Sequence, residues 1–281
     1  MTCEVKVVLD SKNPYNGIRL TTFQLRYWRA IHGEFMTHRV FSRNASSSRA
    51  IPIKKFISQV WNDPAMPVHW GKNQAGMKAR SELTPLQIKL CKFIWISASK
   101  VACIFAYLLS LVGLHKQIGN RILEPWQYIS VIVTATEWDN WFELRNHPDA
   151  QPDIQELARL MYDAMEKSIP EQRYVHMPYV NTEDFVEDII TSDKGVKQLM
   201  EVSTARCARV SYLTHDGQSP SVEKDLKLYQ QLVGSRPLHA SPTEHQAFAT
   251  PEDFFIKNFR GWKQHRVLVE QEIYNQEKTN D

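Results

Sequence analysis

Residues 38–49 read HRVFSRNASSSR, and no other stretch of this 281-residue chain says as much about its fold and chemistry. Two arginines precede a run of asparagine and serine, and a third arginine closes the stretch. Arginine pairs bidentately with phosphate or carboxylate, while serine hydroxyls and the backbone N–H groups of a serine-rich loop add shorter donors. The pattern indicates an anion-binding loop, and its alternative is a solvated basic surface loop of the same composition.

The spacing resembles the signature of the flavin-dependent thymidylate synthases, which reads Arg-His-Arg, a spacer, then Ser-x-Asn-Glu-x-Ser-x-Arg-Tyr. The matching residues are His38, Arg39, Ser42, Asn44, Ser47 and Arg49. The chain departs from the pattern at Thr37, Ala45 and Ala50, which stand for the first Arg, the Glu and the Tyr. Glu34 also replaces a usual glutamine. A carboxylate would repel a bound phosphate, so Glu34 either points away or marks a changed substrate.

Four further blocks of the family pattern occur in a rotated order. GNRILEP (119–125) and NWFELR (140–145) follow the signature, and ARVSY (208–212) and HASPTEH (239–245), which stand at the family's amino terminus, come last. Circular permutation is physically plausible because domain termini often lie at the surface and near one another. A segment at 258–266, NFRGWKQHR, echoes the approach to the signature but lacks its continuation, so we assign the site to 38–49.

The resemblance implies an α+β fold with a central, mainly antiparallel sheet and long helices, in permuted order. We expect one catalytic domain over residues 1–281, with 163–205 holding the connection created by permutation. The family is homotetrameric, with active sites drawn from several subunits, and the same is expected here.

The resemblance also implies a reaction and a set of site residues. A one-carbon unit would pass from methylenetetrahydrofolate to C5 of a deoxypyrimidine monophosphate, with dUMP to dTMP as the leading expectation, FAD as cofactor and NADPH as reductant. The nucleotide would be bound by Ser47, Arg49, Arg121 and Arg145. The flavin would be held by His38, Arg39, Asn44, Asn140, His239, Ser241 and Glu244. The catalytic residues would be Arg145 and His239.

Elementary chemistry supports part of this assignment. A cation at the carbonyl edge of a pyrimidine stabilises the anion that forms as C5 becomes nucleophilic, and Arg145 is suited to that role. Covalent attack by a cysteine is not expected, because the chain lacks the Pro-Cys pair of the usual thymidylate synthase and Cys207 is expected to be a core or loop residue. No HExxH or CxxC spacing gathers the ten histidines, so no metal is expected.

Composition indicates a soluble enzyme. The net charge of +3 fits a small anionic substrate and gives no reason to expect nucleic-acid binding. Four unpaired cysteines and the absence of a signal-peptide pattern predict a cytoplasmic protein. The most apolar stretch, 101–114, is too short to span a bilayer and predicts a buried helix that begins near Thr84, so no membrane contact is expected.

Periodicity predicts several elements. Cys3, Val5, Val7 and Leu9 alternate as on one face of a strand. Helices are expected at 153–168, with Ile154, Leu157, Met161 and Met165 on one face, and at 219–233.

Two further hypotheses stay open. The departures at Thr37, Ala45 and Glu34 are compatible with methylation or hydroxymethylation of dCMP by the same cofactors. They are equally compatible with a catalytically silent nucleotide-binding or scaffolding relative.

Overall fold

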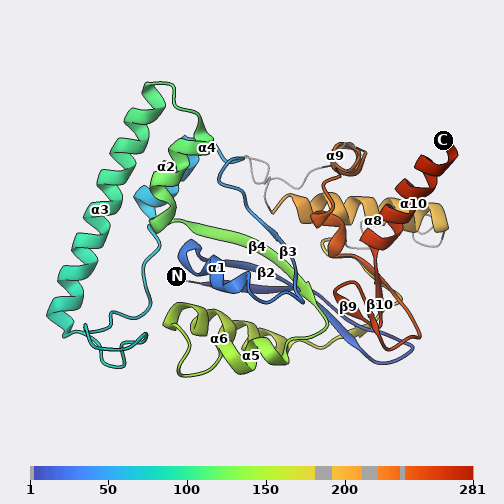
Figure 1. Cartoon of the computed structure of the whole chain (residues 1–281), viewed down its shortest axis with the longest axis horizontal. Helices are drawn as coiled ribbons and strands as arrows, with labels where there is room; N and C mark the ends of the chain where they lie inside the picture. The colour runs from blue at the N-terminus through green and yellow to red at the C-terminus, as the bar shows by residue number, and fades with distance from the viewer. Residues whose placement is uncertain (1–2, 181–191, 211–220, 235–237, 281) are drawn as a thin grey trace.

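The computed structural model describes residues 3–180, 192–210, 221–234 and 238–280, and in them the chain is mixed α+β (Figure 1). The central sheet has the order β3-β4-β2-β1-β5. Its strands are β1 (Glu4–Lys12), β2 (Arg19–Trp28), β3 (Ser42–Ala45), β4 (Tyr128–Ala135) and β5 (Glu171–Gln172). Neighbours pair antiparallel except for the short parallel β1–β5 contact. The expected α+β class and mainly antiparallel sheet are confirmed.

One face of this sheet carries the main apolar core. Alternate residues of β2 and β4, such as Phe23 and Val133, point to that face, as the two-residue period of a strand requires. They pack against α5 (Asp139–Arg145) and α6 (Pro152–Lys167), with the short η1 (Arg29–Ile31) and α1 (His32–Phe35) beside them. The helix predicted at 153–168 is confirmed as α6, and Leu157 and Met161 are fully buried.

The other face is polar at its centre and is covered by later parts of the chain. A second sheet joins β6 (Val175–His176), β7 (Ala247–Ala249) and β10 (Trp262–Gln264). In chain order, η4 (Ser241–Glu244) comes directly before β7. The two-stranded hairpin of β8 (Phe255–Ile256) and β9 (Phe259–Arg260) lies between β7 and β10, and α10 (His265–Asn280) follows β10. Figure 1 shows these segments gathered at the end of the molecule away from α3.

A buried chain of hydrogen bonds crosses the sheet between these layers. His176 binds Ser11 Oγ through Nδ1 and Thr22 Oγ1 through Nε2, each at 2.8 Å. Thr22 and Thr134 join through their hydroxyls at 2.7 Å, and Thr134 reaches Nδ1 of His245 at 2.9 Å. All five side chains are fully buried. Burial lowers the pKa of both histidines to about 3, so both are neutral in the folded protein.

This network predicts acid lability. The histidines stay neutral when folded but take up protons at an ordinary pKa of about 6.5 when unfolded, so unfolding binds protons and the free energy of unfolding falls as pH drops from about 6.5 towards 3. Each contributes a slope of roughly 1.4 kcal/mol per pH unit in that window. Urea unfolding at pH 7.5, 6 and 5 measures it. His245→Gln should flatten the slope and exposed His147→Gln should not; equal slopes in both variants would contradict the account.

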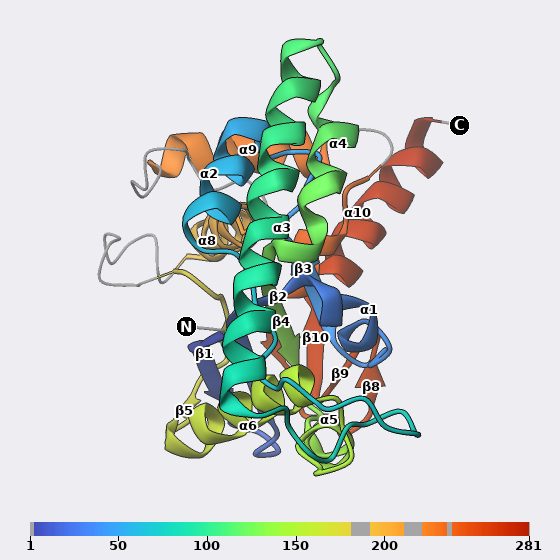
Figure 2. The same cartoon turned by 90° about the vertical axis from the view of Figure 1, so that its left-hand side faces the viewer.

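A helical arm stands at the opposite end of the molecule. It consists of α2 (Ile53–Asn62), α3 (Pro85–Leu111), α4 (Lys116–Gly119) and η2 (Asn120–Trp126), with a small core around Phe56, Ala102 and Cys103. Thr84 caps α3 in a capping box with Gln87, as its predicted start requires. The expectation that the apolar stretch is buried is wrong, because one side of α3 faces solvent (Figure 2).

Helix α3 lies within the span expected from Thr84 to residue 114. It runs for 27 residues, and among the described residues it is the one helix long and apolar enough, by length and composition, to cross a membrane. Only 22% of its most apolar window is buried within the chain.

The remaining helices in the described part of the chain are α8 (Asp193–Ala208) and α9 (Val222–Val233). The predicted helix at 219–233 is confirmed from Ser221, its N-cap, while 219 and 220 lie outside the described residues. The segment 163–205, expected to hold the connection, contains the end of α6, β5, β6 and most of α8. Its residues 181–191 lie outside the described part, so the permuted connection remains a prediction.

Candidate functional site

Helix α5 and the turn before β3 meet at Arg145. Its Nε donates to His38 Nε2 at 3.1 Å, its Nη1 to Glu34 at 3.2 Å and its Nη2 to Thr37 Oγ1 at 3.3 Å. Glu34 therefore points towards the site and not away from it. A guanidinium has five N–H donors, and these contacts take three, so Arg145 keeps donors for a ligand.

His38 is a neutral base in this arrangement. Burial, followed by the charges of Arg145 and Arg43, lowers its pKa to about 4. Its Nε2 accepts from Arg145, which places its remaining proton on Nδ1. The ring stacks on Phe41 and meets the edge of Trp141. Any contact that His38 makes with a cofactor would use an aromatic ring or a single N–H and not a positive charge.

Arg43 fixes the turn that carries His38. From β3 it donates to the carbonyl oxygens of Met36 at 3.0 Å and His38 at 2.8 Å, near the end of α1. The His38 oxygen also accepts from Phe41 N at 3.3 Å, so the guanidinium and the backbone together hold the turn that follows α1. Neighbouring Arg39 is exposed and remains available to an anion.

The rest of β3 binds segments from the end of the chain. Asn44 Nδ2 donates to the carbonyl oxygen of Cys207, the last turn of α8, at 3.1 Å. Ser42 Oγ accepts from Gln264 Nε2 at 2.7 Å and from Asn258 Nδ2 at 3.3 Å. Gln264 also donates to the carbonyl oxygen of Glu244 in η4 at 3.0 Å. The segment 258–266, set aside as a faint echo, thus lies against the signature itself, and Gln264 and Asn258 are additions to the site.

The other predicted flavin residues are exposed or half-buried. Glu244 is half-buried and forms an ion pair with Arg266, while His239 and Ser241 are exposed next to it. Asn140 is exposed on α5. Of ARVSY, residues 211 and 212 lie outside the described part. Cys207 is buried, and burial raises the pKa of its thiol well above its usual value, which supports a core role rather than a nucleophilic one.

The serine-rich loop lies against η2. Asn120 donates to the carbonyl oxygen of Ser48 at 2.6 Å, and Ser48 Oγ approaches Glu124 at 3.4 Å. The same carboxylate pairs with Arg121 at 2.7 Å and with Arg29 at 3.2 Å. We call this set the Glu124 cluster. The residues next to Arg49 and Arg121, Ser48 and Asn120, are thus hydrogen-bonded to each other. Arg49 and Arg121 are both exposed, and Arg121 is paired with Glu124.

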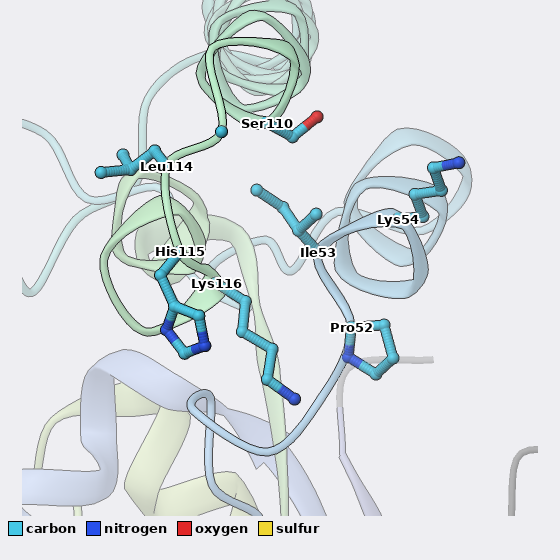
Figure 3. Close-up of a pocket in the computed structure, with 8 residues that line it drawn as sticks. Pro52, Ile53, Lys54, Ser110, Leu114, His115 and Lys116 are labelled. Atoms are coloured by element: carbon cyan, nitrogen blue, oxygen red, sulfur yellow. The ribbon is translucent and has the colours of Figure 1, made fainter.

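A pocket of about 460 Å³ opens behind this loop, between α2, the end of α3 and α4 (Figure 3). It is lined by Ile53 and Leu114, with Lys54, His115 and Lys116 at its rim. Lys116 Nζ donates to the carbonyl oxygen of Ala50 at 2.8 Å, which fixes the end of the serine-rich loop. None of the sequence-predicted site residues lines this pocket, and we place the candidate site at Arg145 and the Glu124 cluster instead.

No protein-family model and no curated protein matches the chain. Among solved structures, the chain is similar to the UMP/dUMP methylase PolB from Streptomyces cacaoi bound with 5-Br UMP. The match has a TM-score of 0.47 and 17% identity and covers 59% of this chain and 89% of that one. It is also similar to the flavin-dependent thymidylate synthase ThyX from Helicobacter pylori complexed with FAD and dUMP. There the TM-score is 0.38, the identity 16%, and the match covers 52% of this chain and 67% of that one.

Proposed function

We propose that the chain is a flavin-dependent enzyme that transfers a one-carbon unit from methylenetetrahydrofolate to C5 of a deoxypyrimidine monophosphate, with dUMP as the leading acceptor. One observation carries the proposal: two of the blocks recognised separately in the sequence hydrogen-bond to residues 38–49, and the other two are joined to it through the adjacent Cys207 and through Gln264. Arg145 binds His38, Asn120 binds Ser48, the end of α8 binds Asn44, and Gln264 bridges Ser42 to η4. Unrelated chance matches would have no reason to meet at one segment.

The residues present fit a nucleotide and a flavin at this place. Exposed Arg49 and Arg121 supply cations for the nucleotide phosphate, and exposed Arg39 supplies one for the flavin phosphates. When bound, reduced flavin supplies the hydride, so the protein needs no nucleophile of its own. The protein's part is to orient the ring, and Arg145, held by three neighbours, is preorganised to stabilise negative charge on it. NADPH, cytoplasmic location and a homotetramer belong to the same proposal by resemblance.

Glu34 favours dCMP as a second candidate acceptor. Its carboxylate lies 3.2 Å from Arg145 and its side chain is 43% exposed. A carboxylate accepts a hydrogen bond from the 4-amino group of cytosine. The 4-oxygen of uracil is itself an acceptor, so a carboxylate repels it. Turnover of both nucleotides by Glu34→Gln tests this. A shift from dCMP towards dUMP supports the second candidate, and an unchanged ratio removes it.

Binding measurements test the site without requiring turnover. We expect the purified protein to bind FAD, seen as a shifted flavin absorbance spectrum, and to bind dUMP or dCMP more tightly than the matching nucleoside. Equal affinity for nucleotide and nucleoside would contradict a phosphate site.

Substitutions of the cations and of the carboxylate at and beside the Glu124 cluster are expected to change nucleotide affinity in opposite directions. Arg121→Ala removes a cation and should weaken nucleotide binding by about 10- to 100-fold, the worth of one charge-assisted hydrogen bond. Arg49→Ala should do the same. Glu124→Gln removes the competing carboxylate and should strengthen binding. Calorimetric titration measures all three, with Arg159→Ala on α6 as an exposed control. Unchanged affinity in Arg49→Ala and Arg121→Ala together would remove the phosphate assignment.

A further inference from the structure

The outward side of α3 carries a continuous apolar seam. Large side chains follow one another three or four residues apart on either side of Ser97, and at Leu86, Leu90, Phe93, Ile104 and Leu111 they are 50% to 78% exposed. Such spacing keeps side chains on one side of a helix. The opposite side packs on α2 through Ala102, Cys103 and Ala106. Among the residues that the structure describes, nothing covers the seam, although the opposite side of the helix is well packed.

The sequence of the seam is nearly a palindrome about residue 99. Equivalent side chains stand at equal distances before and after that position, in the pairs Leu90 and Leu108, Phe93 and Phe105, and Ile94 and Ile104. Nearest the centre stand Ser97 and Val101, where the smaller side chains allow a closer approach of two helices.

A parallel pair of helices matches any sequence with itself, whereas an antiparallel pair matches like with like only when the seam is palindromic. In a twofold-symmetric interface, residue i of one copy contacts residue j of the other, and j contacts i. An antiparallel pair of α3 helices with its axis at the level of Ser99 would place leucine on leucine, phenylalanine on phenylalanine and isoleucine on isoleucine. We propose that the partner of this face is a second copy of the chain, bound in this register.

The size of the seam fits a stable pair. Ten large apolar side chains of residues 86–112 lie on it, each about half exposed or more. Full burial of such a side chain removes roughly 60–120 Å² from water, so ten that are about half exposed or more expose several hundred Å² together. One partner in a standard interface contributes about 800 Å², and monomers rarely expose a contiguous apolar patch of more than a few hundred.

Charge on α3 favours a protein partner over a bilayer. Lys89 and Lys92 are exposed within the helix, and Lys100, at its middle, lies 4.6 Å over the ring of Trp61. Cations this far inside a span are costly in lipid. Since only one side of the helix is apolar and uncovered, it needs a partner along that side alone.

Disulfide trapping distinguishes the register directly. Two differently tagged chains, Leu90→Cys and Leu108→Cys, each also carrying Cys91→Ser, are co-expressed and mildly oxidised. Residues 90 and 108 of one helix are about 27 Å apart, so a 90–108 disulfide can only join two chains. We expect the mixed disulfide to dominate over both like-with-like products. Dominant 90–90 and 108–108 products would overturn the antiparallel register, and the absence of any crosslink would overturn the pair.

Solution mass gives a second readout that does not depend on trapping. The wild-type chain should have an even multiple of its 32.7 kDa mass, and Leu108→Glu should halve it. Ile169→Glu, at a residue 86% exposed outside α3, should leave it unchanged. A monomeric wild-type chain that floats with phosphatidylcholine vesicles would overturn the proposal in favour of a bilayer partner. The outcome does not depend on the proposed chemistry, because no residue of the candidate site is altered.

Discussion

Arg145→Ala is expected to lower kcat for pyrimidine modification by about 10²- to 10³-fold, the usual cost of losing one preorganised donor to a developing negative charge. Nucleotide affinity should fall much less, because the charge of Arg145 matters most once the ring becomes anionic. Arg145→Lys should recover part of the loss, since lysine keeps the charge but not the planar fork. Single-turnover kinetics and equilibrium binding separate the two effects.

A spectroscopic control shows that the variant has changed the intended contact. The charge of Arg145 contributes to lowering the pKa of His38 to about 4, so its removal should raise that pKa towards the ordinary value. Nuclear magnetic resonance titration of His38 measures this shift, and Arg159→Ala is the matched exposed control. Full turnover in Arg145→Ala, with the His38 shift present, would exclude a catalytic role for Arg145.

Asp225→Ala is expected to destabilise the fold by about 3–5 kcal/mol. The carboxylate is fully buried on α9 and accepts from Arg206 Nε at 3.0 Å and Arg209 Nε at 2.8 Å, both at the end of α8. Removal of one partner leaves two cations poorly compensated in a partly buried site, which costs more than the pair contributed. Lys227→Ala, exposed on the same helix, should be neutral.

Asp225→Ala should also weaken binding at the candidate site. The last turn of α8 presents the Cys207 carbonyl oxygen to Asn44, so loosening α8 against α9 should weaken flavin binding in parallel with stability. Urea unfolding and flavin titration measure the two. A stability loss below about 1 kcal/mol would mean that solvent compensates the two arginines.

Local sequence patterns predicted the elements whose signals are local. The Thr84 cap and the period of Ile154, Leu157 and Met161 correctly placed α3 and α6. Strand alternation predicted one face for Val7 and Leu9, but the register shifts between these residues. Leu9 consequently pairs with Thr22 on the polar face. A β-bulge inserts one extra residue into the strand, and the alternation of apolar residues in the sequence gives no sign of it.

For the candidate site too, residues within short motifs were predicted, whereas contacts between residues far apart in the sequence were not. Motif spacing named His38 and Arg145, which the fold brings into contact, and Asn44, which binds the end of α8. Gln264 is 222 residues from its partner Ser42, and the exposed seam of α3 depends on what the rest of the chain leaves uncovered. Hydrophobicity alone could not show that one side of α3 is left exposed by the rest of the chain, so α3 was predicted as a core helix.

The most direct test of the proposed function is mass spectrometry of nucleotides after incubation of the protein with FAD, NADPH, methylenetetrahydrofolate carrying a ¹³C-labelled one-carbon unit, and equal amounts of dUMP and dCMP. The proposed function predicts that one of the two nucleotides gains the label at C5 and that Arg145→Ala loses this product. Stable FAD and nucleotide binding with no labelled product from either nucleotide would contradict it and favour the catalytically silent relative.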